Sequence, residues 1–173
     1  EKRVIAAKAV KLLRPNNSLF IAAGSTCAEM TKVLPDIPLQ VFTDGLVTAL
    51  ELSKYSNIEA TMIGGQINTD SVRSSGFKVF EELNKLHFDF SFLGTDAYRP
   101  DFGFVCCSAH AAALFQTLIE RSDKTVVLMD SSKVDAIRAA RSIPTNQVDI
   151  VVSDGGLSNA TAKALSQAGV MLL

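Results

Sequence analysis

Short apolar runs alternate with stretches of helical spacing along most of the chain. Seven runs, each ending in small or polar residues, have the length and composition of buried strands: 19–23, 39–43, 58–63, 88–94, 125–130, 149–153 and 170–173. Five stretches between them are predicted helices, at 26–34, 46–53, 77–86, 109–121 and 159–167. A further amphipathic helix is predicted over residues 1–14, before Pro15.

The apolar runs carry hydrophobic residues on both faces, which is typical of strands in a parallel sheet that helices cover on each side. Repeated alternation of strand and helix favours right-handed crossover connections. The chain shows no internal repeat, low-complexity tract or linker that would divide it. We therefore predict a single α/β domain over residues 1–173, with an open, mainly parallel sheet and helices on both faces.

The composition supports a folded domain and excludes some classes of binding partner. Of the 173 residues, 47% are hydrophobic, and 17 Lys and Arg stand against 18 Asp and Glu, a net charge of −1. This excludes the low hydrophobicity and high charge of disordered chains and the basic excess of a dedicated nucleic-acid binder. Because no run is long enough to span a membrane and no signal peptide is recognisable, we expect a cytoplasmic protein without a membrane partner.

The opening segment is basic although the whole chain is not. Residues 1–14 contain five basic residues and one acidic residue, Glu1, which gives a local charge of +4. This charge fits a solvated helix face. It also fits a junction to a part of the protein that lies near an anion.

The cysteines and histidines give no sign of a metal or cofactor site. Cys106 and Cys107 are adjacent and Cys27 is distant, so no disulfide framework or CxxC knuckle is available, and we interpret all three as core residues. His87 and His110 are 23 positions apart and lie in no metal-binding motif. Neither the dinucleotide fingerprint nor the nucleotide P-loop occurs. We predict no metal and no cofactor.

Small and polar residues follow the carboxyl ends of the predicted strands. Because parallel strands end at the same edge of a sheet, these segments should come together, and ligands of open α/β sheets bind at this edge. The amides, hydroxyls and carboxylates there are the groups that bind sugars and phosphates. The six segments are Gly24-Ser25-Thr26, Thr43-Asp44-Gly45, Gly64-Gly65-Gln66, Gly94-Thr95-Asp96, Asp130-Ser131-Ser132-Lys133 and Asp154-Gly155-Gly156.

The first segment has the features of an anion site. Gly24 permits close approach of the backbone, and Ser25 and Thr26 stand at a helix start, where free amides and the helix dipole favour a phosphate. Thr26 and Glu29 have the spacing of a capping box, so the alternative is that the hydroxyls only cap the helix. Lys133 would supply countercharge to the phosphate, although a lysine there also fits an ordinary surface.

Taken in order, these segments resemble the effector-binding domain of DeoR-type bacterial repressors of sugar metabolism. The resemblance covers essentially the whole chain and depends on the order and spacing of its parts more than on any single motif. Those parts are Lys2-Arg3 with Ile5-Ala6, the run from Leu19 to Thr26, Val41-Phe42-Thr43-Asp44, Gly64-Gly65, Ser75-Gly76, Asp89, Phe92-Leu93-Gly94, Asp130-Ser131-Ser132-Lys133, Val148-Asp149 and Asp154.

The resemblance implies a fold like that of ribose-5-phosphate isomerase, with a pocket that senses a phosphorylated sugar instead of converting it. It also implies an N-terminal winged helix-turn-helix, outside this chain, that binds operator DNA. The family further implies assembly into dimers or tetramers, for which Phe102, Phe104 and Val105 are candidate exposed apolar residues. The chain would then be a sensor and not an enzyme.

The sensor hypothesis assigns roles to the polar segments. The predicted ligand-binding set is Gly24, Ser25, Thr26 and Lys133 for the phosphate, Asp44, Asp96 and Asp130 for sugar hydroxyls, and Thr43, Gly64, Gly65, Gly94 and His110 around them. Carboxylates give selectivity here, because a buried polar partner left without its hydrogen bond costs about 1–3 kcal/mol.

Several positions depart from the pattern of the resembled family. Ala22 stands in place of an aspartate and Asp44 in place of an asparagine. Ala111 and Phe115 stand where an E-x-x-x-K is typical on the following helix. These changes leave the predicted phosphate site in place but remove standard sugar contacts. His110 is a candidate to replace some of them, the alternative being a helix-capping or surface histidine.

Two other functions remain open at this point. The first is an aldose–ketose phosphate isomerase on the same fold, with Asp96 or Asp130 as the base. Against it, Ala111 occupies the position of the glutamate, and the segment 94–96 lacks the paired acids of the isomerases. The second is a domain that has lost its ligand and serves only assembly.

Overall fold

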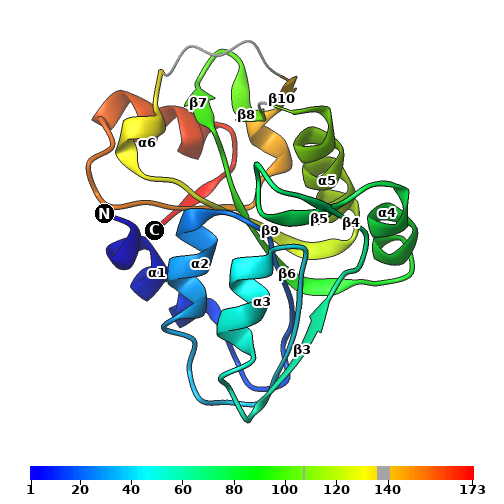
Figure 1. Cartoon of the computed structure of the whole chain (residues 1–173). Coiled ribbons are helices and arrows are strands. Elements are labelled where there is room, and N and C mark those ends of the chain that lie inside the picture. Colours follow the sequence, from blue (N-terminus) through cyan, green and yellow to red (C-terminus); the bar gives the residue numbers. More distant parts are fainter. Residues whose placement is uncertain (107, 136–140) are drawn as a thin grey trace.

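The computed structural model describes residues 1–106, 108–135 and 141–173, and for residues 141 and 142 only the backbone. Seven parallel strands form its central sheet. Figure 1 shows the arrangement. In order across the sheet the strands are β12 (Met171–Leu172), β11 (Ile150–Val152), β9 (Ser122–Leu128), β6 (Phe88–Gly94), β1 (Ser18–Ile21), β2 (Leu39–Thr43) and β3 (Ile58–Met62). All seven predicted strands are present.

Helices cover both faces of this sheet, which confirms the predicted fold class. One face carries α1 (Lys2–Ala9), α2 (Ser25–Thr31) and α3 (Leu46–Leu52), and the other carries α4 (Phe77–Leu83), α5 (Ala109–Glu120) and α6 (Asn159–Gln167). Among the described residues, no helix has the length and apolarity of a membrane span.

Side chains of the central strands alternate between two hydrophobic cores. In β1, Leu19 and Ile21 belong to the core under α1, α2 and α3, whereas Phe20 belongs to the core under α4, α5 and α6. The same alternation holds in β9, where Val126 and Val127 enter opposite cores. Because successive residues of a strand point to opposite faces, a strand between two helical layers must be apolar at nearly every position.

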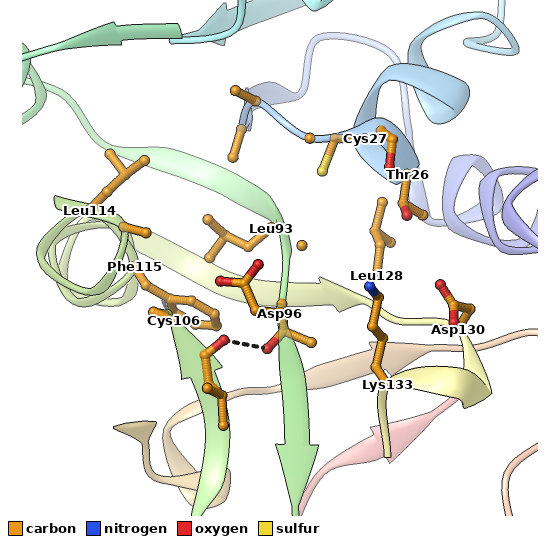
Figure 2. A pocket seen from close by; sticks show the side chains of 18 of the residues that line it. Thr26, Cys27, Leu93, Asp96, Cys106, Leu114, Phe115, Leu128, Asp130 and Lys133 are labelled. Carbon is orange, nitrogen blue, oxygen red and sulfur yellow. Dashed lines mark hydrogen bonds between the residues drawn. The ribbon is translucent and has the colours of Figure 1, made fainter. Parts of the chain in front are cut away.

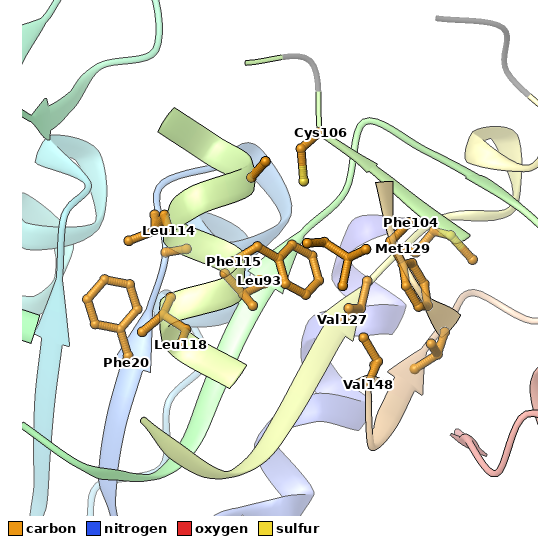
Figure 3. Packing of buried hydrophobic residues seen from close by; sticks show 14 of the residues in the cluster. Phe20, Leu93, Phe104, Cys106, Leu114, Phe115, Leu118, Val127, Met129 and Val148 are labelled. Carbon is orange, nitrogen blue, oxygen red and sulfur yellow. The ribbon is translucent and has the colours of Figure 1, made fainter. Parts of the chain in front are cut away.

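Helix α5 supplies much of the second core. Its Phe115 and Leu118 are almost completely buried, and Figure 3 shows them beside Phe20, Val127 and other apolar side chains of the sheet. The aromatic ring of Phe20 also contacts that of Phe88, with 5.6 Å between the ring centroids. This packing fixes α5 over the centre of the sheet.

The predicted opening helix is shorter than expected. It consists of α1 followed by a 3₁₀ turn (Val10–Leu12), and the chain is extended at Leu13 before Pro15. One side of α1 is buried through Ile5, and Lys8 Nζ donates to the carbonyl of Ser153 at 2.9 Å. The basic face of this helix is therefore partly engaged with the sheet and not wholly solvated.

Two small antiparallel units were missed by the sequence pattern. One is a hairpin of β4 (Gln66–Asn68) and β5 (Arg73–Ser75). The other is a sheet of β7 (Ala97–Arg99), β8 (Gly103–Cys106) and β10 (Arg141–Ile143). Their strands have three or four residues each, too few for a period of two to stand out.

The second of these units corrects the expectation of an exposed apolar segment. Phe104 and Val105 are buried because β8 lies between β7 and β10, and only Phe102 of the three residues is exposed. The expected burial of Cys27 and Cys106 is confirmed. Cys107 lies outside the described residues.

The order of the strands creates a crevice at the carboxyl edge of the sheet. After β1 the chain moves outward to β2 and β3, whereas from β6 it moves the opposite way to β9, β11 and β12. The adjacent strands β1 and β6 therefore form the topological switch point, where ligands of open α/β sheets bind.

Replacing a buried and an exposed phenylalanine by alanine should change the stability of the fold by different amounts. Phe20→Ala should lower the free energy of unfolding by about 3–5 kcal/mol, because it opens a cavity beside Phe88 and Leu118. Phe77→Ala should change it by about 0.5 kcal/mol or less, since the Phe77 side chain is exposed. Urea unfolding of both variants measures this difference, and equal losses would contradict the described packing.

Candidate functional site

A cavity of about 230 Å³ lies at the topological switch point, between the ends of β1 and β6. The structure brings seven of the twelve predicted site residues to its surface: Gly24, Ser25, Thr26, Gly94, Asp96, Asp130 and Lys133. They come from segments that follow β1, β6 and β9, three neighbouring strands. The expectation that these loops meet at one edge is therefore met for the central strands.

The other five predicted residues do not line the cavity. Thr43 and Asp44 are fully buried beneath it, and Gly64 and Gly65 lie beside the hairpin of β4 and β5. His110 is half-buried in the first turn of α5, with its ring 5.3 Å from that of Phe80. It does not cap the helix, because Ser108 Oγ accepts from the amide of Ala111 at 3.0 Å.

The start of α2 presents free amides to the cavity. The helix begins at Ser25, one residue earlier than predicted, and Gly24 is its N-cap with φ of +152°, a conformation that favours glycine. The predicted capping box is absent, since Thr26 lies inside the helix and Glu29 pairs with Lys32 at 2.5 Å. Among the described residues, none accepts a hydrogen bond from the first-turn amides.

Of the residues that the structure describes, three with cationic side chains line the same cavity: Lys2, Arg73 and Lys133. The sequence pattern identified only Lys133. Lys2 reaches the site from α1, where its Nζ donates to Ser25 Oγ at 2.9 Å. In the sequence it was marked by the local positive charge of residues 1–14 and by the Lys2-Arg3 pair of the family resemblance, but not as a site residue. Arg73 lies in the short hairpin that the pattern missed, so nothing in the sequence marked it.

Lys133 is held by a turn that carboxylates stabilise. It ends a 3₁₀ turn (Ser131–Lys133) whose N-cap, Asp130, accepts from the amide of Ser132 at 3.2 Å. Asp154 accepts from the amide of Ser131 at 3.3 Å. Figure 2 shows Lys133 and Asp130 on the side of the cavity where Thr26 lies. The turn thus places the cation of Lys133 and the carboxylate of Asp130 near the start of α2, and we call this part of the cavity its polar end.

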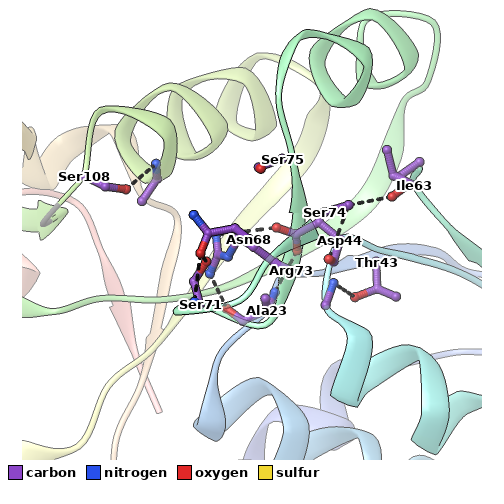
Figure 4. A network of polar contacts seen from close by, with 12 residues as sticks. Ala23, Thr43, Asp44, Ile63, Asn68, Ser71, Arg73, Ser74, Ser75 and Ser108 are labelled. Carbon is purple, nitrogen blue, oxygen red and sulfur yellow. Dashed lines mark hydrogen bonds and ion pairs between the residues drawn. The ribbon is translucent and has the colours of Figure 1, made fainter. Parts of the chain in front are cut away.

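The polar contacts of Asp44 connect the end of β1 with the hairpin, as Figure 4 shows. Asp44 Oδ1 accepts from the amide of Ala23 at 2.7 Å, and Oδ2 lies 3.4 Å from Arg73 Nη1. Arg73 Nη2 donates in turn to the carbonyl of Ala23 at 2.9 Å. The carbonyl of Asp44 accepts from the amide of Ser74 at 2.8 Å. Asp44 therefore positions the cavity wall from beneath.

Burial dominates the ionisation of this buried cluster. Desolvation raises the pKa of Asp44, while Arg73 and the amide of Ala23 limit the rise. Desolvation also lowers the pKa of His110, and the positive charge of Arg73 lowers it further, against a smaller effect of Asp44. His110 is thus biased toward its neutral form.

The side of the cavity opposite Lys133 is apolar. In Figure 2, Cys106, Leu114 and Phe115 lie on the side away from Lys133, and Ala22, Leu93, Val105 and Ala111 also line the cavity. Ala22, Ala111 and Phe115 are three of the positions that depart from the family pattern, and all three line the cavity. Cys27 also lies beside it but has no exposed surface, and burial raises the pKa of its thiol to about 12.

No metal site accompanies this cavity in the part of the chain that the structure describes, where no group of three His, Cys, Asp or Glu side chains could hold an ion.

Comparison with sequence families and curated proteins identifies relatives over the whole chain. A family model described as the DeoR C terminal sensor domain matches residues 1–155. The chain is 32% identical to the HTH-type transcriptional regulator YulB of Bacillus subtilis, 28% identical to the HTH-type transcriptional regulator GolR of Listeria innocua, and 27% identical to the putative aga operon transcriptional repressor of Escherichia coli O157:H7. These alignments cover 95–99% of the chain but only 64–67% of those proteins.

Solved structures show the fold more widely. Ribose 5-phosphate isomerase A of Methanocaldococcus jannaschii matches with a TM-score of 0.55 and 18% identity, over 77% of this chain and 53% of that one. The translation initiation factor eIF-2B of Pyrococcus horikoshii matches with a TM-score of 0.59 and 18% identity, over 87% and 61%. At this identity the likeness establishes the architecture alone.

The contacts of Asp44 predict a large stability loss on truncation. Asp44→Ala should lower the free energy of unfolding by about 3–5 kcal/mol, because it leaves the amide of Ala23 without its buried acceptor and the guanidinium of Arg73 without its buried counter-charge. Asp101→Ala, which breaks the exposed pair with Arg99, is the matched control and should have little effect. Urea unfolding compares the two, and similar small losses would show that the Asp44 contacts contribute little.

The burial of Cys27 predicts an inert thiol. At about pH 8, where an ordinary thiol is partly ionised, iodoacetamide should leave Cys27 unmodified in the folded chain and modify it after denaturation. Peptide mass spectrometry at increasing denaturant concentration measures this. Rapid labelling of the native chain would instead identify Cys27 as an accessible, activated thiol.

Proposed function

This chain belongs to the family of DeoR C-terminal sensor domains, and from that membership we propose that its cavity binds a phosphorylated sugar as a regulatory effector. The family, with relatives named as transcriptional regulators, assigns the chain to transcription regulation and not to catalysis. The isomerase alternative therefore has only the shared fold in its favour.

The gathering of positive charge at one end of the cavity carries the effector proposal. Lys2 and Lys133 line that end together with the free amides at the start of α2. Arg73 adds a third cation, although its charge is shared with Asp44. Charge-assisted hydrogen bonds of this kind suit the oxygens of a phosphate.

Two carboxylates line the cavity beside the proposed phosphate position. Asp96 and Asp130 line the cavity, and we assign to them the acceptance of hydrogen bonds from sugar hydroxyls. Asp44, which the sequence also suggested for this role, instead accepts from Ala23 and pairs with Arg73. Its proposed role is to position the wall, and Thr43, which donates to the carbonyl of Ile21 at 2.6 Å, supports the same strand end.

Binding at this end of the cavity can influence α1. The contact of Lys2 with Ser25 joins α1 to the first turn of α2, so a phosphate there would compete with it or reinforce it. We propose that operator DNA is bound by a helix-turn-helix module outside these 173 residues, since the relatives are named HTH-type regulators and are longer than this chain. Ligand-dependent placement of α1 would then carry the signal.

Assembly into dimers or tetramers is part of the same proposal. Large apolar side chains are exposed on α3, the hairpin and α4, namely Val47, Leu50, Ile67, Val72 and Phe77. Scattered apolar residues are ordinary on protein surfaces, but several on neighbouring elements suit a contact with another copy. Ligand binding would change the relative placement of the DNA-binding modules through such a contact.

The effector proposal predicts a specific loss of phosphate affinity. In calorimetric titrations with ribose 5-phosphate and inorganic phosphate, Lys133→Ala should bind roughly ten- to a hundredfold more weakly than the unmodified chain, because a charged hydrogen-bond donor is removed. Lys163→Ala, an exposed lysine on α6, is the matched control and should bind like the unmodified chain.

The two variants separate the possible outcomes. Equal weakening in both would indicate only a general effect of net charge. Absence of binding by a broad panel of sugar phosphates would overturn the effector proposal and favour the alternative of a domain that serves assembly alone.

A further inference from the structure

The cavity has two chemically different ends, and from this we propose that its ligand is a phosphate ester whose far end is hydrocarbon and carries no hydroxyl. This inference rests on the proposed binding of a phosphorylated ligand and adds the chemistry of the part remote from the phosphate. Figure 2 shows Thr26, Asp130 and Lys133 on one side of the cavity and Leu114, Phe115 and Cys106 on the other.

The apolar end is a continuous wall built by three elements. Helix α5 contributes Ala111, Leu114 and Phe115, strand β8 contributes Val105, and β6 contributes Leu93. Four of these side chains are nearly or completely buried in the fold, so the wall is held in place by the core beneath it. Among the described residues that form this wall, none carries a charged side chain.

The backbone of the wall offers few partners to a ligand hydroxyl. The carbonyl of Val105 already accepts from Thr95 Oγ1 and from the amide of Asp96, each at 3.0 Å. The amide of Ala111 donates to Ser108 Oγ. The amides of Leu114 and Phe115 lie inside α5, where helical hydrogen bonds satisfy them. A ligand hydroxyl that faces Leu114 and Phe115 would therefore lose its hydrogen bonds to water, and these backbone groups would not replace them.

Ligand hydroxyls near the phosphate would lie close to carboxylates that line the cavity. The carboxylate of Asp96 lies between the two ends of the cavity in Figure 2, and Asp130 lies at the polar end. A ligand with its phosphate near Lys133 would place its nearest carbons beside these carboxylates. The following carbons would then reach Leu114 and Phe115. The arrangement thus accepts hydroxyls near the phosphate and favours CH₂ or CH₃ at the far end.

The cavity volume is consistent with a ligand of this size. About 230 Å³ is below the usual range of drug-sized pockets, which begins near 300 Å³. A short phosphorylated carbon chain can then contact both ends at once. Since an apolar pocket discriminates against an added hydroxyl by up to roughly a hundredfold, we expect a preference of about ten- to a hundredfold for the deoxygenated end.

Matched pairs of phosphate esters test this inference on the 173-residue chain. Erythritol 4-phosphate and ribitol 5-phosphate are each compared by calorimetry with the analogue in which the terminal CH₂OH is CH₃. At least one methyl analogue should bind tenfold or more tightly than its parent. If neither analogue binds more tightly than its parent, the inference is wrong, while phosphate binding that depends on Lys133 would still support the effector proposal.

Two alanines of α5 provide matched variants. Ala111→Ser places a hydroxyl in the wall and should reduce the preference for the methyl analogue several-fold. Ala113→Ser makes the same change on the exposed side of the helix and should leave the preference intact. If both variants keep the full preference, α5 does not form the discriminating wall and the inference fails. If neither inorganic phosphate nor any phosphate ester binds, the effector proposal and this inference fail together.

Discussion

The hydrogen bond from the amide of Ala23 to the buried carboxylate of Asp44 is the constraint on which the site depends. It fixes Ala23, two residues after the end of β1, beside the topological switch point between β1 and β6. The chain can then leave through Gly24 at positive φ and begin α2 at Ser25 with its first amides free. Together with the hydrogen bond from the amide of Ala22 to the carbonyl of Phe92, the bond to Asp44 fixes the start of α2 relative to the end of β6.

Burying this carboxylate has an electrostatic consequence that reaches the cavity. A carboxylate without exposed surface needs a nearby cation or strong donors, and Arg73 lies close enough to serve. The same guanidinium lines the cavity, so Arg73 belongs both to the support of the wall and to its electrostatic field. An anion bound near Arg73 would compete with Asp44 for its charge. Binding of the proposed ligand would thereby be coupled to the hairpin that carries Arg73.

Most of the fold could be predicted from the sequence because it depends on local pattern. Strands that helices cover on both faces are apolar at nearly every position, and short apolar runs marked all seven strands, including the edge strand β3, in which four of five residues are exposed. The hairpin and the small sheet were missed because their strands have only three or four residues each, and because β10 reaches β8 from a distant part of the chain. Helix ends shifted by a few residues, as at Ser25, where backbone conformation and not a side-chain cap starts the helix.

The candidate site was predictable only as far as it follows strand ends. Loops after β1, β6 and β9 could be assigned to one edge, because parallel strands end together. Whether each residue at this edge is buried or lines the cavity could not be predicted. Asp44 and Thr43 were therefore expected to contact the ligand, although both are buried and do not line the cavity. Lys2 and Arg73 were missed since each arrives from an element outside that rule, a helix and a hairpin.

The departures from the family pattern acquire meaning only from their position. In the sequence, charged residues of the family pattern are replaced by Ala22, Ala111 and Phe115. These replacements are compatible with a lost ligand site and with a site that binds a different ligand. In the structure all three line the cavity that Lys2 and Lys133 also line. Apolar substitution of a single wall is what a change of ligand requires, since a hydrocarbon group and a hydroxyl cannot both be well solvated by the same surface.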